Sequence, residues 1–168
     1  YQTRETKYDI ATQWEEDFAL TIMYTSGTTG FPKGVCQTVS NHSASAVSSA
    51  LNLGISEKDT WLCIVPIFHI SGFSIVVRSL LYGMKIRLYE KFDAKRCAQE
   101  IINGTVTKMS VVAVILEKIL SEMERLGQSA HPDFSTMLAG GGQVPIDYLK
   151  RAEKLDLRVA QTYGMTET

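Results

Sequence analysis

The chain has 168 residues, with 17 lysines and arginines, 18 aspartates and glutamates, and a formal net charge of -1. Apolar residues make up 45% and charged residues 21%, which is the composition of an ordinary globular protein with a sizeable core. This balance, without a block of lysine and arginine, argues against nucleic acid as the main partner, because phosphate binding needs clustered positive charge. No membrane span is expected either, since Arg78, Lys85 and Arg87 break the longest apolar runs well short of roughly 20 residues.

Strand-like and helix-like segments alternate along the chain. Residues 1–19 are polar and form a predicted lead-in, and residues 20–168 form the predicted core domain. The predicted elements, in chain order, are a strand at 20–24, a helix at 42–53 capped by Asn41, a strand at 61–65, a helix at 71–82, a strand at 85–89, a helix from the N-cap Asp93 to 103, a strand at 109–112, a helix at 116–126, a strand at 137–139, a helix at 145–154 and a strand at 158–161. This order predicts an α/β fold, a layered parallel sheet with helices on both faces. The run 71–82 is too apolar for a surface helix, so we expect it to be buried.

The cysteines and the ends of the chain bear on its context. Cys36, Cys63 and Cys97 are far apart and odd in number, which predicts neither a disulfide framework nor a zinc site and favours a reducing, cytoplasmic compartment. The chain starts with Tyr1, shows no secretory signal and stops at Thr168 just after a Gly-Met-Thr-Glu run, so we expect a piece of a longer protein.

A segment rich in glycine and hydroxyl groups follows the first predicted strand, from Tyr24 to Gly34. Its glycines let backbone N–H groups point at a ligand, its hydroxyls can donate to phosphate oxygens, and Lys33 adds positive charge. A solvated surface loop would have a similar composition, but the order of these residues after a buried strand favours a polyphosphate site. The spacing excludes a Walker A loop, because Phe31 follows Gly30 and Gly34 follows Lys33. The candidate ligands of the phosphates are Thr25, Ser26, Gly27, Thr28, Thr29, Gly30 and Lys33.

Two further segments follow predicted strands. In residues 161–168, Tyr163 offers a flat face for a base, Thr166 can bond a phosphate oxygen, and Glu167 is a hard oxygen ligand of the kind that Mg²⁺ prefers. A strand end with a solvated glutamate is the alternative. The glycines of 140–142 would let the backbone approach a flat ligand, although Pro145 alone would explain a strand-to-helix turn there.

Two side chains stand out in the apolar stretch between 66 and 82. A lone histidine in such surroundings, here His69, is more often structural than catalytic. Arg78, if buried, needs a partner. One possibility is an internal acidic partner, and another is a side chain whose guanidinium reaches the surface. The third is a second carboxylate on the substrate as the partner.

In the order of these segments the chain resembles the adenylate-forming enzymes, which include acyl- and aryl-CoA ligases, luciferases and the adenylation domains of peptide synthetases. Residues 24–34 match the phosphate loop of that family at essentially every position, and residues 161–168 match its second motif. The resemblance implies an AMP-forming acid–thiol ligase that uses ATP, Mg²⁺ and coenzyme A. It also implies that the chain is part of the family's large N-terminal domain. An acidic ribose ligand, a hinge, an adenylation lysine and the C-terminal domain would lie downstream, so we expect these 168 residues alone to be inactive.

The resemblance implies roles for individual residues. The loop residues and Lys33 would hold the β- and γ-phosphates, Tyr163 would stack on adenine, Thr166 would contact the α-phosphate, and Glu167 would bind magnesium. His69 would lie beside the carboxylate, as a positioning or electrostatic group rather than a general base, because that carboxylate is already ionised near neutral pH. The nucleotide-binding set is completed by Gly140, Gly141, Gly142, Gly164 and Met165.

Residues 35–93 resemble one branch of the family, the 2-succinylbenzoate–CoA ligases of menaquinone biosynthesis. The resemblance rests on segments 36–42 and 66–72 and on Arg78 ahead of 91–94. The substrate of that branch carries two carboxylates, which gives the arginine a partner.

The predicted substrate-binding residues are therefore His69, Ser71 and Arg78, while His42 and His131 receive no role. Two other readings stay open: another acyl- or aryl-CoA ligase, and a non-catalytic nucleotide-binding module. The sequence leaves the oligomeric state open, a homo-oligomer included.

Overall fold

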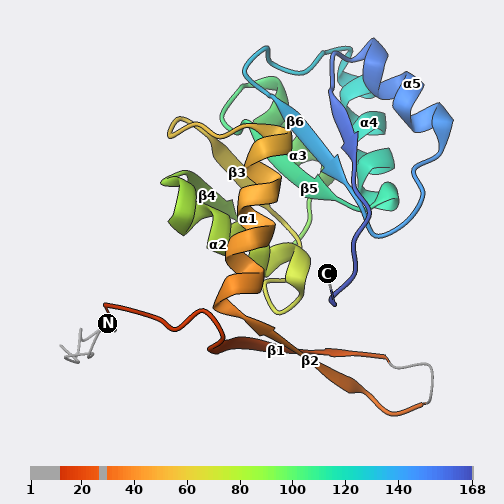
Figure 1. Cartoon of the computed structure of the whole chain (residues 1–168). Coiled ribbons are helices and arrows are strands. Elements are labelled where there is room, and N and C mark those ends of the chain that lie inside the picture. Colours follow the sequence, from red (N-terminus) through yellow and green to blue (C-terminus); the bar gives the residue numbers. More distant parts are fainter. Residues whose placement is uncertain (1–11, 27–29, 168) are drawn as a thin grey trace, which may run out of the picture.

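The computed structural model describes residues 12–26 and 30–167 (Figure 1). Within these ranges the elements are β1 (Ala19–Thr25), β2 (Lys33–Thr38), α1 (Val39–Leu53), β3 (Thr60–Cys63), α2 (Ile70–Tyr82), β4 (Lys85–Leu88), α3 (Ala94–Ile102), β5 (Lys108–Val111), α4 (Ala113–Leu126), β6 (Thr136–Ala139), α5 (Ile146–Lys154) and β7 (Val159–Gln161). A five-stranded sheet has the order β4-β3-β5-β6-β7, and each of its neighbouring pairs is parallel. The predicted α/β fold with a parallel sheet is confirmed.

Helices cover both faces of this sheet, as predicted. On one face, Trp61 and Cys63 of β3 pack with Ile75 of α2, and Leu53 of α1 joins the same cluster. On the other face, a larger cluster unites Leu62 with buried side chains of the neighbouring strands and of three helices. Its members from the strands and helices include Met109, Met137, Cys97, Ile101, Leu116, Ile119, Leu120, Met123 and Ala152. Successive side chains of β3 therefore pack into cores on opposite faces of the sheet, as expected for a strand between two helix layers.

The first strand, β1, is not part of the five-stranded sheet. β1 pairs antiparallel with β2, which the sequence did not predict, and the two form a separate hairpin that projects from the body of the molecule (Figure 1). The expectation of one parallel sheet built from every strand is therefore wrong for residues 20–24. β2 contains Lys33, Gly34 and Gln37, and such polar and flexible residues carry no strong strand signal.

The ends of the helices follow local chemistry. Thr38 caps α1: its hydroxyl accepts from the Asn41 N–H at 3.2 Å, and the Asn41 side chain accepts from the Thr38 N–H at 2.9 Å. Asn41 is therefore the third residue of a capping box and not the N-cap that was predicted. Asp93 caps α3 as predicted, with its carboxylate accepting from the Arg96 N–H at 3.1 Å.

The expectation of a buried α2 is only half right. Gly72 and Ile75 are buried, but Leu80 and Leu81 are 80% and 55% exposed. One side of the helix packs on α1 and on strands β3 and β4, and its other side faces outward. Among the described residues, no helix is long and apolar enough to cross a membrane. All three cysteines are free.

Candidate nucleotide and carboxylate site

The carboxyl ends of the parallel strands bring three of the predicted segments to one edge of the sheet. β3 ends at Cys63 and leads to His69, β6 ends at Ala139 and leads to Gly140, and β7 ends at Gln161 and leads to the 162–167 segment. Ala139 and Gln161 are register partners, so the last two segments start side by side. In open α/β sheets, ligands bind in the crevice outside the carboxyl ends of the strands.

The glycines after β6 are needed for close packing at this edge. The Thr162 N–H donates to the Ala139 carbonyl at 2.9 Å. A Cβ on Gly140 would lie 2.8 Å from Thr162 Cγ2, and Gly141 has a φ of +76°. A side chain at position 140 would therefore force the Thr162 side chain to move, and position 141 favours glycine by its left-handed backbone.

Neighbouring positions leave room for a flat ligand. Gly142 and Gly164 have nothing within 4 Å of where a Cβ would lie. The side chain of Tyr163 is 91% exposed, so its ring is available for stacking, and Met165 is half exposed at 48%. Stacking of a base on Tyr163 stays a prediction.

The hairpin presents the described part of the phosphate loop. Thr25 at the end of β1 and Lys33 at the start of β2 are register partners, and the Lys33 side chain is exposed. Ser26 and Gly30 are also exposed, and Gly30 has a φ of +86°. The predicted ligands Gly27, Thr28 and Thr29 lie outside the described residues.

A residue that the sequence did not single out joins the hairpin to the segment after β7. The side-chain amide of Gln37, which is 7% exposed, donates from Nε2 to the carbonyl oxygen of Thr166 at 2.6 Å. Figure 1 shows the end of the chain reaching toward the hairpin. The link joins the β1–β2 hairpin to the segment that carries Glu167. The sequence carried no signal for this contact, because along β2 the polar Gln37 is buried and the apolar Cys36 is exposed, the reverse of a hydrophobic alternation.

The predicted histidine begins α2. His69 is the N-cap residue, no side chain caps this end of the helix, and the imidazole is exposed. The view of His69 as a structural core histidine is therefore wrong. The backbone N–H groups and the positive end of the helix dipole meet at this end, close to the exposed Ser71. Such a helix end favours a carboxylate.

Arg78 is the most unusual cation in the described part of the chain. Its guanidinium lies over the ring of Trp61, 5.3 Å from the ring centroid. Its Nε atom is buried and has no hydrogen-bond partner there, and burial lowers the pKa of the group. Within the described residues no acidic side chain forms an ion pair with it, so the internal salt bridge that was considered is not found. An orphaned buried donor on a cation is a place where an anionic ligand gains affinity.

His42, to which the sequence gave no role, is buried between β1 and α2. Its Nε2 lies 3.0 Å from the Thr21 hydroxyl, and its ring meets that of Phe73 edge-on at 5.2 Å between centroids. The residue is 5% exposed, and burial lowers the pKa of its imidazole.

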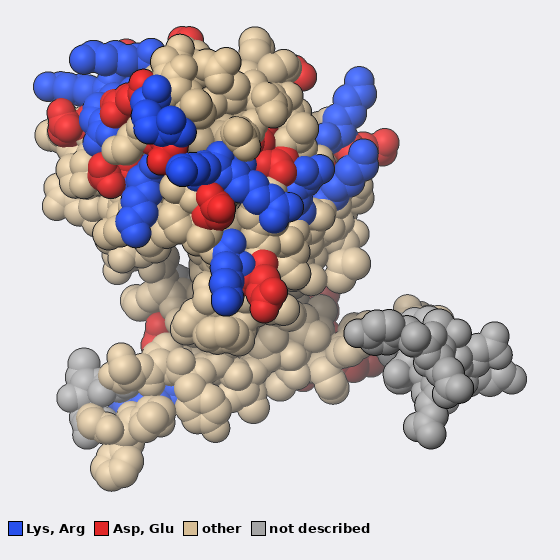
Figure 2. All heavy atoms as spheres, turned by 180° about the vertical axis from the view of Figure 1, so that it is seen from behind, with Lys and Arg blue, Asp and Glu red and all other residues tan. Residues whose placement is uncertain are grey.

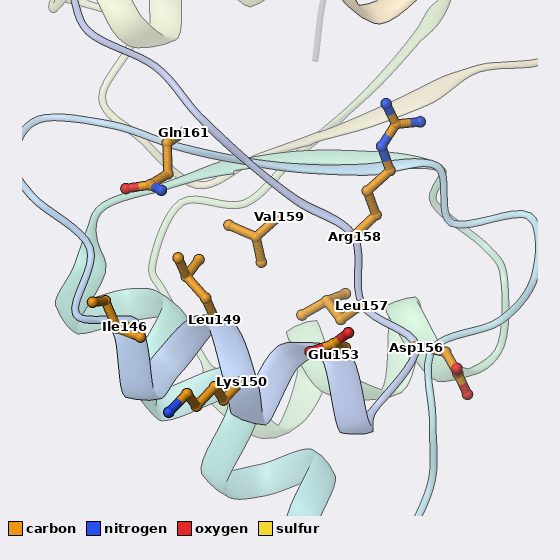
Figure 3. A pocket seen from close by; sticks show the side chains of 9 residues that line it. All are labelled: Ile146, Leu149, Lys150, Glu153, Asp156, Leu157, Arg158, Val159 and Gln161. Carbon is orange, nitrogen blue, oxygen red and sulfur yellow. The ribbon is translucent and has the colours of Figure 1, made fainter.

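A cavity of about 470 Å³ lies between α5 and β7, away from these residues (Figure 3). Its walls mix the apolar Ile146 and Leu149 with the charged Lys150, Glu153 and Arg158. Of the predicted site residues, none lines it. On the face shown in Figure 2, basic and acidic side chains are interspersed.

A magnesium ion bound through Glu167 would have to be held largely by phosphate. They contain no group of three histidine, cysteine or acidic side chains that could form a protein cage, and Glu167 stands as a single carboxylate. Mg²⁺ in nucleotide sites takes one or two carboxylates together with phosphate oxygens and water.

These features are those of a nucleotide-dependent enzyme of the AMP-binding class. The profile of the AMP-binding enzyme family matches residues 2–168, and the chain belongs to this family. It is 55% identical over 149 residues to a 2-succinylbenzoate–CoA ligase of Geobacillus kaustophilus, a match that covers 88% of this chain and 30% of that protein. It is 47% identical over 167 residues to a 2-succinylbenzoate–CoA ligase of Listeria innocua, covering 99% of this chain and 35% of that protein.

Two solved structures are also similar to this chain. The chain is similar to the o-succinylbenzoate coenzyme A synthetase of Bacillus subtilis in complex with ATP and magnesium ion, with a TM-score of 0.86 and 42% identity over 98% of this chain and 34% of that one. It is also similar to the N-terminal domain of FACL13 from Mycobacterium tuberculosis, with a TM-score of 0.85 and 30% identity over 95% of this chain and 40% of that one. The chain thus spans about a third of the length of the curated relatives, which are 30% and 35% covered.

Proposed function

We propose that the protein containing this chain is an ATP-dependent 2-succinylbenzoate–CoA ligase of menaquinone biosynthesis that works through an acyl-adenylate. The observation that carries the proposal is the 47% identity to such a ligase over 99% of the chain. The geometry supports it, because the glycine turn, the 162–167 segment and the N-terminus of α2 share one edge of the sheet. The three free cysteines suit a cytoplasmic enzyme.

In this proposal ATP lies across the carboxyl edge of the sheet. Tyr163 stacks on adenine, with the backbone of 140–142 and of Gly164 and Met165 beside it. Thr166 contacts the α-phosphate. The β- and γ-phosphates are held by the loop residues Thr25, Ser26, Gly27, Thr28, Thr29, Gly30 and Lys33.

The chemistry has two steps. A carboxylate oxygen of the substrate attacks the α-phosphorus of ATP, a new P–O bond forms, and pyrophosphate leaves. The sulfur of coenzyme A then attacks the acyl carbon, and AMP leaves. Magnesium held by Glu167 would neutralise phosphate charge, and Lys33 would stabilise the charge that builds up on the leaving pyrophosphate.

The substrate's two carboxylates have separate sites in this proposal. The reacting carboxylate lies at the N-terminus of α2, near His69 and Ser71, where the helix dipole favours negative charge. The second carboxylate pairs with Arg78. His69, the N-cap residue of α2, and Arg78 are nine residues apart, or about 13 Å along the helix axis, so in this proposal the Arg78 side chain extends toward the N-terminus to meet the second carboxylate.

The test is carboxylate-dependent exchange of pyrophosphate into ATP by the intact protein. We expect strong exchange with 2-succinylbenzoate and weak exchange with benzoate or a medium-chain fatty acid. Equal exchange with a monocarboxylate would refute the specific proposal and leave another acyl- or aryl-CoA ligase, which the similarity to FACL13 would then favour. Binding of ATP without exchange for any of these acids would favour a non-catalytic nucleotide-binding module.

A further inference from the structure

A line of side chains runs from the base of the hairpin into the body of the molecule. Gln37 Nε2 donates to the carbonyl oxygen of Thr166 at 2.6 Å. The Thr21 hydroxyl lies 3.2 Å from Gln37 Oε1 and 3.0 Å from His42 Nε2. Gln37 and His42 are buried, at 7% and 5% exposure, and Thr21 and Thr166 are half-buried, so each of these contacts has one buried partner.

The Thr166 carbonyl fixes the direction of every bond in this line. A carbonyl oxygen only accepts, so the amide nitrogen of Gln37 faces it and the amide oxygen faces Thr21. Thr21 has a single hydroxyl proton, which it gives to Gln37 Oε1. The hydroxyl must therefore accept from His42, whose Nε2 carries a proton. A turned-round Gln37 amide would set two carbonyl oxygens against each other.

The line ends against α2, whose N-cap residue is His69. The His42 ring contacts the Phe73 ring edge-on, with 5.2 Å between centroids. Phe73 lies one turn after His69, and its N–H donates to the His69 carbonyl at 2.9 Å. The hairpin, the 162–167 segment and the first turn of α2 are thus joined by one set of directed contacts.

We propose that Gln37 is a positioning residue that registers the phosphate-loop hairpin against the 162–167 segment, with Thr21 and His42 extending that registration to α2. The role rests on the proposed function, because the hairpin and the segment are the two parts assigned to ATP. Gln37 touches neither ATP nor the carboxylate in this assignment. It acts by holding Thr166 and its neighbour Glu167 at a fixed place relative to the loop.

The test uses the intact protein and two pairs of variants. Gln37→Leu keeps the bulk of the side chain and removes both hydrogen bonds, and Gln37→Glu keeps the acceptor for Thr21 but sets a carboxylate against the Thr166 carbonyl. Thr21→Val removes the hydroxyl, and Thr21→Ser keeps it. We expect Gln37→Leu and Gln37→Glu to raise the KM for ATP in pyrophosphate exchange by about tenfold, and Thr21→Val by about threefold, the scale of one or two lost hydrogen bonds. Thr21→Ser, which keeps the hydroxyl, should have the same KM for ATP as the wild type.

The matched control is Thr107→Val. Thr107 is also a half-buried threonine with its hydroxyl in a side-chain network, where it donates to Asp59 at 2.8 Å and accepts from the Thr60 N–H at 3.0 Å. That network lies at the amino ends of β3 and β5, opposite the proposed site. Thr107→Val should lower thermal stability and leave the KM for ATP unchanged. An equal rise in KM for Thr107→Val and Thr21→Val would show general loosening and overturn the proposal.

A second readout is independent of the reaction. Hydrogen–deuterium exchange of the ligand-free protein should be about tenfold faster over residues 162–167 in Gln37→Leu than in the wild type, and unchanged there in Thr107→Val. Unchanged exchange in Gln37→Leu would overturn the positioning role even if the protein proves to be the proposed ligase. Faster exchange together with no pyrophosphate exchange for any acid would keep the positioning role and refute the proposed function.

Discussion

Gly72 lies so close to the backbone of Pro66 that a Cβ on residue 72 would come within 2.3 Å of the Pro66 carbonyl oxygen. The same carbonyl accepts a hydrogen bond from the His69 N–H at 3.1 Å. The turn that presents the imidazole of His69 can therefore pack this closely only because residue 72 has no side chain.

Gly72→Ala should damage the handling of the carboxylate. The methyl group would meet backbone atoms, which move only if the whole turn moves, so His69 and Ser71 would be displaced. We expect kcat/KM for the carboxylate in pyrophosphate exchange to fall by at least about tenfold, in line with the cost of an ångström-scale misplacement. The control is Leu80→Ala on the same helix, where the side chain is 80% exposed. If Gly72→Ala behaves like this control, the turn does not position the substrate.

Replacing Arg78 separates the two carboxylates of the proposed substrate. In Arg78→Met an apolar chain of similar length still covers Trp61, and the cation is lost. We expect the KM for 2-succinylbenzoate to rise by about 10- to 100-fold, the effect of one charged hydrogen-bonded pair, and the KM for benzoate to stay the same. Arg78→Lys should recover only part of the loss, because an ammonium lacks the two-pronged geometry of a guanidinium. An equal loss for both acids would return Arg78 to a structural role.

The buried ion pair of Asp59 and Lys108 should matter for stability and not for ligand binding. Lys108 Nζ lies 2.6 Å from Asp59 Oδ2, and the two side chains are 5% and 9% exposed. Lys108→Met leaves the buried Asp59 carboxylate without its cation and with hydrogen bonds only from the Thr107 hydroxyl and the Ser56 N–H, so we expect a loss of about 3–5 kcal/mol in denaturant unfolding. The double variant Asp59→Asn/Lys108→Met should regain most of this loss. A single variant as stable as the wild type would contradict this prediction and show that the hydrogen bonds from Thr107 and Ser56 suffice for the Asp59 carboxylate.

Protonation of His42 should destabilise the protein in mildly acidic solution. Burial lowers the pKa of this imidazole below its usual value of 6.5. The unfolded chain therefore binds more protons than the folded one between that lowered pKa and about pH 6.5, and stability falls as the pH drops through this window. Below the lowered folded pKa this contribution is constant. Wild-type and His42→Gln proteins, compared by unfolding between pH 7.5 and about pH 5, should differ in this slope. Identical slopes would contradict the assignment to His42, and ¹³C-labelled histidine spectra would report its pKa directly.

Local sequence specified most elements of the parallel sheet. Apolar runs placed β3 to β7, and Asp93 set the start of α3 through a side-chain hydrogen bond that needs only four consecutive residues. The cap of α1 shows the limit of this reasoning. Thr38 and Asn41 both favour a helix start, and only the reciprocal bonds of the capping box decide which is the cap.

The sequence by itself determined which side chains are available for the proposed chemistry: hydroxyls and a lysine that could hold phosphate, an aromatic face that could stack on a base, and the Glu167 carboxylate that could bind a metal ion. These follow from residue type and order along a short stretch of chain. The tertiary structure alone decided that β1 pairs with the unpredicted β2, that the Nε atom of the half-buried Arg78 is buried with no hydrogen-bond partner among the described residues, and that Gln37 meets Thr166 from 129 residues away. Pairing, burial and long-range hydrogen bonds depend on which surfaces meet after folding, and no local pattern of residues contains that information.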